Sequence, residues 1–564
     1  MSSVISCVAW VKRGVAAQQP TKYNLDEKEL ERVSALARIE LEDARIELER
    51  AHEAAQQMGK GAEEEEEADE SDDMADEANE EEHVSEDDRM DEDGEQAHPK
   101  PTSTDPNDLS AYKLDDYDKE TKQDATGLFS NIKGLTYYKD NEEDPYITLK
   151  EDDDDEREEL QILPSDNLIV TAKTEDDISQ LEIYVYDERE ENLYVHHDLM
   201  LPAFPLCLEW LDFPPAGPQT TETPTKQFGN YIAVGTFDPE IEIWSLDTVE
   251  AMYPDAILGR PDQTALHVPM PLGTGKKKRK KTKPRQTVAS HHVDAVLSLS
   301  WNRTHRNLLA SASADKTVKL WDLTRDPSAE GEAGGAIRSF DLHEDKVQAV
   351  QWNPTEPTVL LTGSYDRTVR TFDSRAPEAG VAALVGADVE DLRWDPFEPH
   401  SFVVSLENGL VLNFDARTLS SERNKATPAR WTLSAHNGAA SSIDINPHVR
   451  GCLATGGTDK MVKIWNIIDE GSSPKVSMAG SRDLGIGKVF SVQWSPDDSL
   501  TLAAAGSKAV MQIWDVGSTV SMRKAFGSKL QDAGIQLKER ESGGVIGVHD
   551  EDEDEESGWE DDGE

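Results

Sequence analysis

A segment that ends in an aromatic residue followed by an acidic or polar one recurs through the second half of the chain. Three clear copies read LLASASADKTVKLWD at 308–322, VLLTGSYDRTVRTFD at 359–373 and CLATGGTDKMVKIWN at 452–466. A further copy, LAAAGSKAVMQIWD, lies at 502–515, a weaker one at 402–415, and earlier ones at 168–187 and 231–246. Repetition at steps of about 40 to 50 residues is typical of chains built from β-sheet units of four strands each.

A second pattern precedes most copies: a short alternating segment that ends in tryptophan. Its tryptophans are Trp210, Trp301, Trp352, Trp394 and Trp494, and SIDIN around Ile445 takes its place once. Within one copy, apolar Val318 and Leu320 flank polar Lys319, as a strand with one buried face requires. Two patterns that recur together in a fixed order predict a repeated set of β-strands.

These motifs resemble WD repeats. In that family a His before the first strand, a Ser or Thr on the second, an Asp in the next turn and a Trp on the third form a hydrogen-bonded tetrad. Two copies match the tetrad in full and a third lacks only the Trp. The residues are His292, Ser311, Asp315 and Trp321; His436, Thr455, Asp459 and Trp465; and His343, Thr362 and Asp366, with Phe372 in place of the Trp. The resemblance implies a structural role for all of them. The copies around Phe414 and Trp514 lack the His, so no tetrad is expected there.

The copies predict an all-β fold, a seven-bladed WD-repeat β-propeller. The first copy has no tryptophan-terminated strand just before it, whereas VISCVAW at Val4–Trp10 has the spacing of such a strand. We expect this N-terminal strand to be the inner strand of the first blade. A ring closed in this way leaves no sheet edge exposed, which avoids edge-to-edge aggregation.

Charge divides the chain into a folded part and acidic segments. The formal net charge of −56 is concentrated in runs such as Glu63–Glu67, Asp152–Glu156 and Asp550–Glu556. Like charges repel one another and bury no apolar surface, so these runs predict disorder. The predicted organisation is an N-terminal strand in 1–14, a helical and acidic, largely disordered insertion in 15–160, the propeller in 161–527 with a basic loop at 260–288, and an acidic disordered tail in 528–564.

The insertion contains two segments of different character. Leu25–Met58 has apolar spacings that predict a short helix, either solvated and held by pairs such as Glu42 with Arg45 or bound to a partner. The acidic stretch Glu63–Glu95 is either a solubilising spacer or a binding site for basic proteins such as ribosomal proteins or histones. Ser85 precedes three acidic residues, a context that favours phosphorylation by an acidophilic kinase.

One segment, GKKKRKKTKPR at 275–285, has the opposite charge. Its basic residues are Lys276, Lys277, Lys278, Arg279, Lys280, Lys281, Lys283 and Arg285. The segment falls between two predicted blades, so we expect an exposed loop. It is interpreted as a nuclear import signal, as a contact for RNA phosphate, which is compatible with import, or as a plain solvated linker. No aromatic residues are interleaved, so stacking on bases is not indicated.

The remaining composition argues against several classes of protein. Cys7, Cys207 and Cys452, without a CxxC pair, predict neither a disulfide framework nor a zinc site and favour a reducing compartment. The apolar N-terminus lacks the basic leading region of a signal peptide, and no apolar run reaches the roughly 18 residues of a membrane span. The sequence contains no P-loop, GxSxG or HExxH motif. We therefore expect a soluble protein that is not an enzyme and has no cofactor, metal site, membrane partner or small-molecule substrate.

Several features together resemble the periodic tryptophan protein 1 family of eukaryotic WD-repeat proteins. They are ISCVAWVKRGVA at the N-terminus, the acidic region after it, LYVHHDLMLPAFPLCLEWLD before the second blade, the basic loop before HHVDAVLSLSWN, and the acidic tail. The resemblance covers nearly the full length. It implies a nuclear, nucleolar scaffold of ribosome biogenesis and rRNA processing that docks assembly factors in early precursors of the large (60S) subunit.

Two other functions are open on the sequence. One is a histone- or chromatin-binding propeller, which also combines blades, nuclear entry and acidic stretches. The other is a substrate receptor of a ubiquitin ligase. The expected partners are ribosome assembly factors and the pre-ribosomal particle, with rRNA phosphate at the basic loop and basic proteins at the acidic segments as further candidates.

Overall fold

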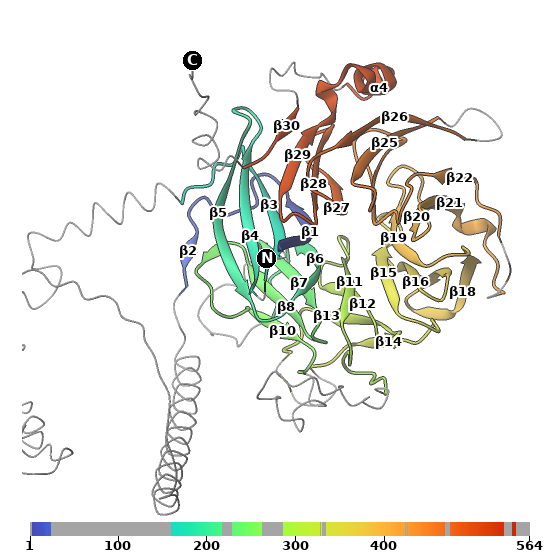
Figure 1. Cartoon of the computed structure of the whole chain (residues 1–564). Coiled ribbons are helices and arrows are strands. Elements are labelled where there is room, and N and C mark those ends of the chain that lie inside the picture. Colours follow the sequence, from blue (N-terminus) through green and yellow to red (C-terminus); the bar gives the residue numbers. More distant parts are fainter. Residues whose placement is uncertain are drawn as a thin grey trace, which may run out of the picture. The chain divides into compact units, whose positions relative to one another are not determined.

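The computed structural model describes residues 3–23, 160–216, 228–261, 286–534 and 544–548, apart from short gaps at 177, 328, 330–333, 423–424, 426 and 469–473. Within these ranges, seven four-stranded antiparallel sheets are arranged as blades around an axis (Figure 1). The seven-bladed propeller expected from the repeats is confirmed. Among the described residues, no helix has the length and apolar composition needed to cross a membrane.

Each of the first four blades runs from an innermost strand near the axis to an outer strand at the rim, and the strands follow in that order. Blade 1 has β1 (Ser3–Val11), β3 (Asn167–Glu175), β4 (Ile178–Asp187) and β5 (Asn192–Leu201). Blade 2 has β6 (Pro205–Leu211), β7 (Tyr231–Thr236), β8 (Ile241–Ser245) and β10 (Ala256–Leu258). Blade 3 has β11 (Val296–Trp301), β12 (Leu308–Ser313), β13 (Val318–Asp322) and β14 (Arg338–Phe340). Blade 4 has β15 (Val347–Trp352), β16 (Val359–Ser364), β17 (Thr368–Asp373) and β18 (Ala376–Leu384).

The other three blades follow the same order. Blade 5 has β19 (Val389–Trp394), β20 (Ser401–Leu406), β21 (Leu410–Asp415) and β22 (Trp431–Ser434). Blade 6 has β23 (Ser442–Ile445), β24 (Cys452–Gly456), β25 (Met461–Ile468) and β26 (Lys475–Asp483). Blade 7 has β27 (Val489–Trp494), β28 (Thr501–Gly506), β29 (Met511–Asp515) and β30 (Val545–Ile546). The described elements outside the blades are β2 (Thr21–Lys22), β9 (Thr248–Val249), the 3-10 helices η4 (Ala416–Thr418) and η5 (Val516–Ser518), and α4 (Val520–Asp532).

Most innermost strands share one irregularity near their start. Their pairing with the second strand shifts register between Ile5 and Cys7 in blade 1 and between Val296 and Ser298 in blade 3. Blades 2, 4, 5 and 7 have the same shift at the equivalent position. A β-bulge adds twist and bends the strand that carries it. The repeated bulge therefore bends the innermost strand of six blades in the same way.

The N-terminal strand β1 occupies the innermost position of blade 1. Its residues Val4–Val11 pair with β3, although the chain between the two strands is the long insertion. It also lies beside blade 7: the backbone N–H of Val8 donates to Ser491 Oγ at 3.3 Å and the Trp10 indole to Gln493 O at 3.1 Å. Figure 1 shows β1 among β3, β6 and β27. The first residues of the chain thus close the ring against its last blade.

Two boundaries expected from composition are wrong. The predicted insertion at 15–160 begins too early, because β2 pairs with β9 and the N–H of Ala17 donates to Asp247 Oδ1 at 3.0 Å. The predicted tail at 528–564 also begins too early. Helix α4 continues to Asp532, and β30 pairs with β29 as the outer strand of blade 7. In both places buried apolar side chains or backbone hydrogen bonds hold a segment on the propeller, although the charge around it predicted disorder.

Three of the sequence predictions lie outside the described residues. These are the helix at Leu25–Met58, the phosphorylation site at Ser85 and the role of the basic residues Lys276–Arg285. They stay predictions.

Replacing Trp10 with Ala should destabilise the propeller, because Trp10 is 7% exposed and lies at the seam between blades 1 and 7. Truncation of a buried Trp costs about 3–5 kcal/mol, which denaturant unfolding of the full chain would measure. Lys12→Ala, at the exposed residue two positions on, is the control. Equal unfolding midpoints for the two variants would contradict the placement of β1.

Candidate functional site

The propeller has two faces that differ in their connections. We call the upper face the one that carries the connections between successive blades and the turns between second and third strands. The lower face carries the connections from first to second and from third to fourth strands. Loops placed on a rigid β-scaffold are the usual location of binding residues, so these faces are where a site is sought.

Blade 3 brings together the four tetrad residues predicted from its motif. His292 Nδ1 lies 2.9 Å from Asp315 Oδ2, and its Nε2 lies 2.7 Å from Ser311 Oγ. The Trp321 indole N–H donates to the same Ser311 Oγ at 2.8 Å. His292 is fully buried, and burial lowers its pKa, so we place one proton on Nδ1, directed at the acceptor carboxylate. The pKa of the Asp315 carboxyl is raised by burial but lowered more by its bonds to His292 and Thr317, which leave it at about 2.

Blade 6 repeats this arrangement and blade 4 repeats part of it. His436 bonds Asp459 and Thr455, and Trp465 donates to Thr455 Oγ1 at 2.9 Å. In blade 4, His343 lies 2.9 Å from both Asp366 Oδ2 and Thr362 Oγ1. Phe372 has no indole donor there and packs edge-on against Phe340, with ring centroids 5.2 Å apart. These residues bond one another and link the second and third strands to the upper-face loops.

Blades 1 and 2 use a different bond that the sequence analysis missed. In blade 2 the Trp244 indole donates to Glu242 Oε2 at 3.0 Å, and in blade 1 the Tyr184 hydroxyl donates to Glu182 Oε2 at 2.5 Å. In each case a Glu two residues before the aromatic replaces the hydroxyl acceptor of the tetrad. Burial raises the pKa of Glu242 to about 7, with a smaller contribution from Glu240 and Asp238. The similar short sequences LEIY at 181–184 and IEIW at 241–244 were the signal in the sequence that could have predicted this bond.

Around the axis, the residue before an inner-strand tryptophan, or before Ile445 in blade 6, bonds to the next blade. Its side chain accepts from the backbone N–H of the next blade's tryptophan in four cases: Glu209 from Trp301 at 3.1 Å, Ser300 from Trp352 at 3.1 Å, Gln351 from Trp394 at 2.6 Å and Asp444 from Trp494 at 2.7 Å. Side chains two residues earlier on the inner strands also accept from a backbone N–H of the next blade. The pairs are Ser298 with Val350, Asp391 with Ile443, Ser442 with Val492, and Ser491 with Val8. These residues fix neighbouring blades to one another.

Charged residues of the inner strands meet near the axis. Arg393 Nη1 lies 2.9 Å from Asp391 Oδ1, and its Nε lies 3.5 Å from Asp444 Oδ1. Burial raises the pKa of Asp391 and of Glu209, and that of Asp444 to about 6, and the charge of Arg393 opposes each shift. One arginine therefore stabilises three carboxylates on the inner strands of blades 2, 5 and 6.

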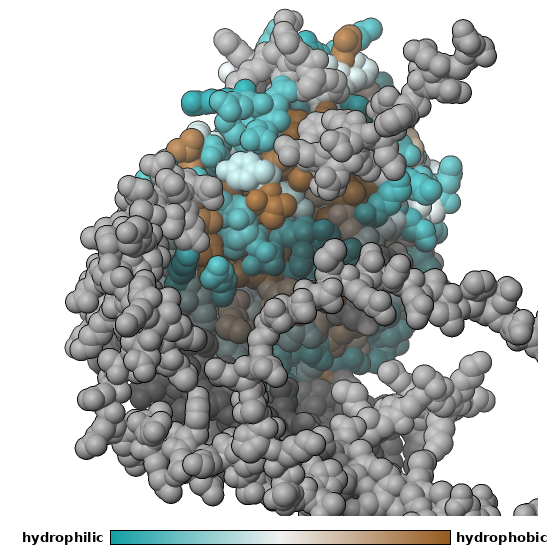
Figure 2. All heavy atoms as spheres, turned by 60° about the vertical axis from the view of Figure 1, so that its left-hand side comes forward, coloured by the Kyte–Doolittle hydropathy of each residue, from teal (hydrophilic) through white to brown (hydrophobic). Residues whose placement is uncertain are grey.

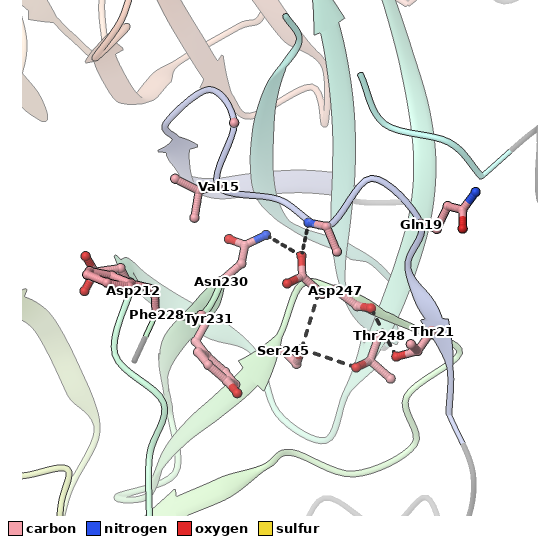
Figure 3. Close-up of a pocket in the computed structure, with 13 residues that line it drawn as sticks. Val15, Gln19, Thr21, Asp212, Phe228, Asn230, Tyr231, Ser245, Asp247 and Thr248 are labelled. Carbon is pink, nitrogen blue, oxygen red and sulfur yellow. Dashed lines mark hydrogen bonds between the residues drawn. The ribbon is translucent and has the colours of Figure 1, made fainter. Parts of the chain in front are cut away.

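A cavity of about 540 Å³ opens on the lower face of blade 2 (Figure 3). Its two walls are the N-terminal segment 14–21 and the ends of β6, β7 and β8. Asp247 accepts from Ala17 N and from Asn230 Nδ2, both at 3.0 Å, while Asn230 Oδ1 accepts from the Trp210 indole at 2.9 Å. The polar groups of the cavity thus hold the N-terminal segment against blade 2, which is a structural task.

The rim of this cavity has an exposed aromatic residue. Phe228 is 64% exposed, and the Arg306 guanidinium lies 4.3 Å from its ring centroid while bonding Asp212. At the upper-face end of blade 1, Ile178 and Met200 are also more than half exposed. Figure 2 shows hydrophobic side chains interspersed with hydrophilic ones on the coloured part of the side that is on the left in Figure 1.

Within the described ranges, no group of three or more His, Cys, Asp or Glu side chains is placed to hold a metal ion. The thiols of Cys7, Cys207 and Cys452 are free, and burial raises the pKa of each, to about 12 for Cys7. A raised pKa keeps a thiol protonated and unreactive.

The fold and its repeated tetrads define a WD-repeat β-propeller protein. The family described as WD domain, G-beta repeat, matches residues 282–322, 334–373 and 429–466, which contain the bonded histidines of blades 3, 4 and 6. The chain is 35% identical over 585 residues to periodic tryptophan protein 1 of Saccharomyces cerevisiae, covering 95% of this chain and 92% of the relative.

The chain belongs to the periodic tryptophan protein 1 family. It is also 30% identical over 423 residues to the periodic tryptophan protein 1 homolog of Drosophila melanogaster, covering 74% of this chain and 80% of that one. An uncharacterized WD repeat-containing protein of Schizosaccharomyces pombe is 41% identical over 546 residues, 95% of this chain and 93% of its own length.

Replacing Arg393 with Met should lower the free energy of unfolding by about 3–5 kcal/mol near pH 8, because it leaves partly buried carboxylates without their cation. A carboxyl group whose pKa is raised on folding destabilises the folded state as pH rises from its unfolded to its folded pKa. Removing the cation raises the folded pKa of Asp444 above the value of about 6 that it has beside Arg393. The contribution of Asp444 to the loss therefore develops above about pH 6, and the loss should shrink as the pH falls below that value.

Denaturant unfolding at several pH values measures this loss. The control is Arg417→Met, since the Arg417 side chain in η4 is 67% exposed and pairs with Asp415 at the end of β21; exposed pairs contribute about 0–1 kcal/mol. A loss at Arg393 that did not depend on pH would contradict the electrostatic explanation.

Proposed function

We propose that this protein is a non-catalytic docking scaffold of ribosome biogenesis in the nucleolus. It would hold assembly factors together in early precursors of the large ribosomal subunit. The observation that carries the proposal is membership of the periodic tryptophan protein 1 family over 95% of the chain, because the resemblance of the motifs to that family implies this function. The propeller supplies two faces and a rim on which several proteins can dock at once.

A scaffold role is supported by what the polar residues already do. His292 and His436 bond within their blades, Glu209 and Asp444 bond between blades, and Asp247 holds the N-terminal segment. Each of these groups is used in holding the fold. A catalytic site needs a nucleophile or base within reach of a substrate position, and these side chains are directed at structural partners.

The basic residues Lys276–Arg285 are proposed to serve nuclear import, with contact to rRNA phosphate as a compatible second use. The described residues that flank them lie on the upper face, between blades 2 and 3. There Lys319 Nζ donates to Val288 O at 2.6 Å, which fixes the chain soon after the basic run. The acidic segments are proposed to bind basic proteins, and Ser85 within one of them is proposed to be phosphorylated by an acidophilic kinase.

A tagged full chain should co-sediment with large-subunit precursors in a sucrose gradient of nuclear extract, and sequencing of bound RNA should recover precursor rRNA. RNase treatment or high salt should release the protein, since a scaffold is held by the particle's RNA and proteins. Recovery of core histones without rRNA would instead favour the chromatin-binding function. Co-purification with a cullin adaptor and without rRNA would favour the ubiquitin-ligase function.

Replacing the eight basic residues between Lys276 and Arg285 with Gln should move a fluorescently tagged chain from the nucleus to the cytoplasm, because import signals are recognised through their positive charge. The matched control exchanges Lys and Arg at the same positions and keeps the charge. Nuclear accumulation of the Gln variant equal to that of the control would contradict the assignment.

A further inference from the structure

A groove lies between blades 3 and 4 on the lower face, with a cavity of about 290 Å³. Leu308 and Leu320 of blade 3 give it apolar surface, and Thr358 and Ser374 of blade 4 form the facing wall. Arg338 and Arg375 also line it and bring positive charge. This combination of apolar and basic residues is unlike the cavity of blade 2, whose polar groups are occupied by the N-terminal segment.

The corresponding groove between blades 6 and 7 is filled by α4. The helix buries Met522, Phe526 and Leu530, spaced four residues apart, in one hydrophobic cluster with Cys452 and Leu500. Lys529 Nζ fixes the helix by donating to three acceptors on blade 6: Arg450 O, Ile467 O and Asn466 Oδ1, at 2.7–2.9 Å. The chain itself thus shows how an amphipathic helix binds between two of these blades.

Strand pairing establishes that the two grooves are equivalent. On the first wall, Leu320 pairs with Arg338 in blade 3 as Ile464 pairs with Gly480 in blade 6. On the second wall, the N–H of Ser374 donates to Thr358 O at 2.8 Å in blade 4. The N–H of Val516 donates to Leu500 O at 2.9 Å in blade 7. The groove between blades 3 and 4 is therefore the counterpart of a surface that binds a helix.

The main difference between the two grooves is the residue at the position that faces α4 in blade 6. A Cβ atom on Gly480 would collide with the Met522 side chain, so the missing side chain makes room for α4. Arg338 stands in that place in blade 3. Its Nη1 donates to two backbone carbonyls, Ser374 O at 2.7 Å and Arg375 O at 3.2 Å. Neutral carbonyls orient the guanidinium across the groove without neutralising its charge, and a guanidinium binds carboxylates strongly.

We propose that this groove binds an amphipathic helix of a partner protein that carries an acidic residue at the position where α4 carries Met522. The carboxylate would bond Arg338, and an apolar residue four positions on, where α4 has Phe526, would cover Leu308 and Leu320. The proposal rests on the docking function above and gives it one specific surface.

The test uses a helix-constrained, fluorescently labelled peptide with the sequence of residues 519–533 and Met522→Glu. The constraint is needed because isolated helices of this length are marginal in water. Fluorescence anisotropy with the full chain should detect binding, and Arg338→Glu should weaken it by about tenfold or more. Lys488→Glu, an equal charge change at an exposed residue of the upper face, should leave the affinity unchanged.

A charge exchange sharpens the result. A peptide with Met522→Lys should bind the Arg338→Glu chain more tightly than the natural one, since the two charges have changed places. Thermal melting of each variant comes first. If Arg338→Glu lowers the melting temperature, Arg338→Gln, which keeps donors for the two carbonyls, replaces it in the comparison.

Two outcomes would overturn the proposal. One is that the Met522→Glu peptide binds no more tightly than the unmodified α4 peptide, or that it binds the natural chain and the Arg338 variant with equal affinity. The other concerns Glu330 and Glu332, two acidic residues in the sequence between β13 and β14. If a chain with Glu330→Gln and Glu332→Gln binds the peptide about tenfold more tightly, this segment of the chain itself, and no partner helix, is the occupant of the groove. If either outcome is found but the chain still co-sediments with precursor particles, the groove proposal is wrong and the proposed docking function stands.

Discussion

The structure depends on how the innermost strand of each blade satisfies its free edge. Such a strand has a sheet neighbour on one side only, and an unpaired N–H in a buried place is costly. In this ring the preceding blade provides the acceptor, as Glu209 does for Trp301 and Asp444 does for Trp494. Blades 2 to 7 thus each complete the hydrogen bonding of the blade that follows, and these bonds join neighbouring blades around the ring. The Arg393 guanidinium pairs with two of these axial acceptors, and it offsets the negative charge that their repetition would otherwise accumulate.

Within a blade, the bonding is less uniform than between blades. Blades 3 and 6 have the full His, Asp, hydroxyl and Trp arrangement, whereas blades 1 and 2 use Glu182 and Glu242 as acceptors for an aromatic residue. In blade 4 the aromatic Phe372 is held by packing against Phe340. The tetrads, the Glu–aromatic hydrogen bonds and the Phe372–Phe340 packing all position the third strand of their blade, so a blade tolerates different interactions at its centre. Variation of this kind leaves the outer surfaces free to differ from blade to blade.

The features that could be predicted from the sequence are those that repeat at a fixed local spacing. The strands, the tetrads at His292 and His436 and the seven-fold ring follow from a motif that occurs several times over, and so does the strand at the N-terminus. Features that arise once could not be predicted. The bond from Ala17 to Asp247 joins residues that are far apart in the sequence, and β30 is a two-residue strand in an acidic context. The bond between Trp244 and Glu242 does recur, as Tyr184 with Glu182, but it could not be predicted because it has no counterpart in the tetrad pattern of the WD family.

The seam between blades 1 and 7 has a consequence for how the chain is made. Val8 and Ser491, bonded across it, are separated by 483 positions, so β1 is synthesised long before the blade that completes its set of neighbours. Domains of this size fold in stages during synthesis. Until blade 7 is complete, β1 has one flank without its final partner, and pairing over so long a separation is intrinsically slow. Protection by a chaperone during translation would therefore be most valuable for β1.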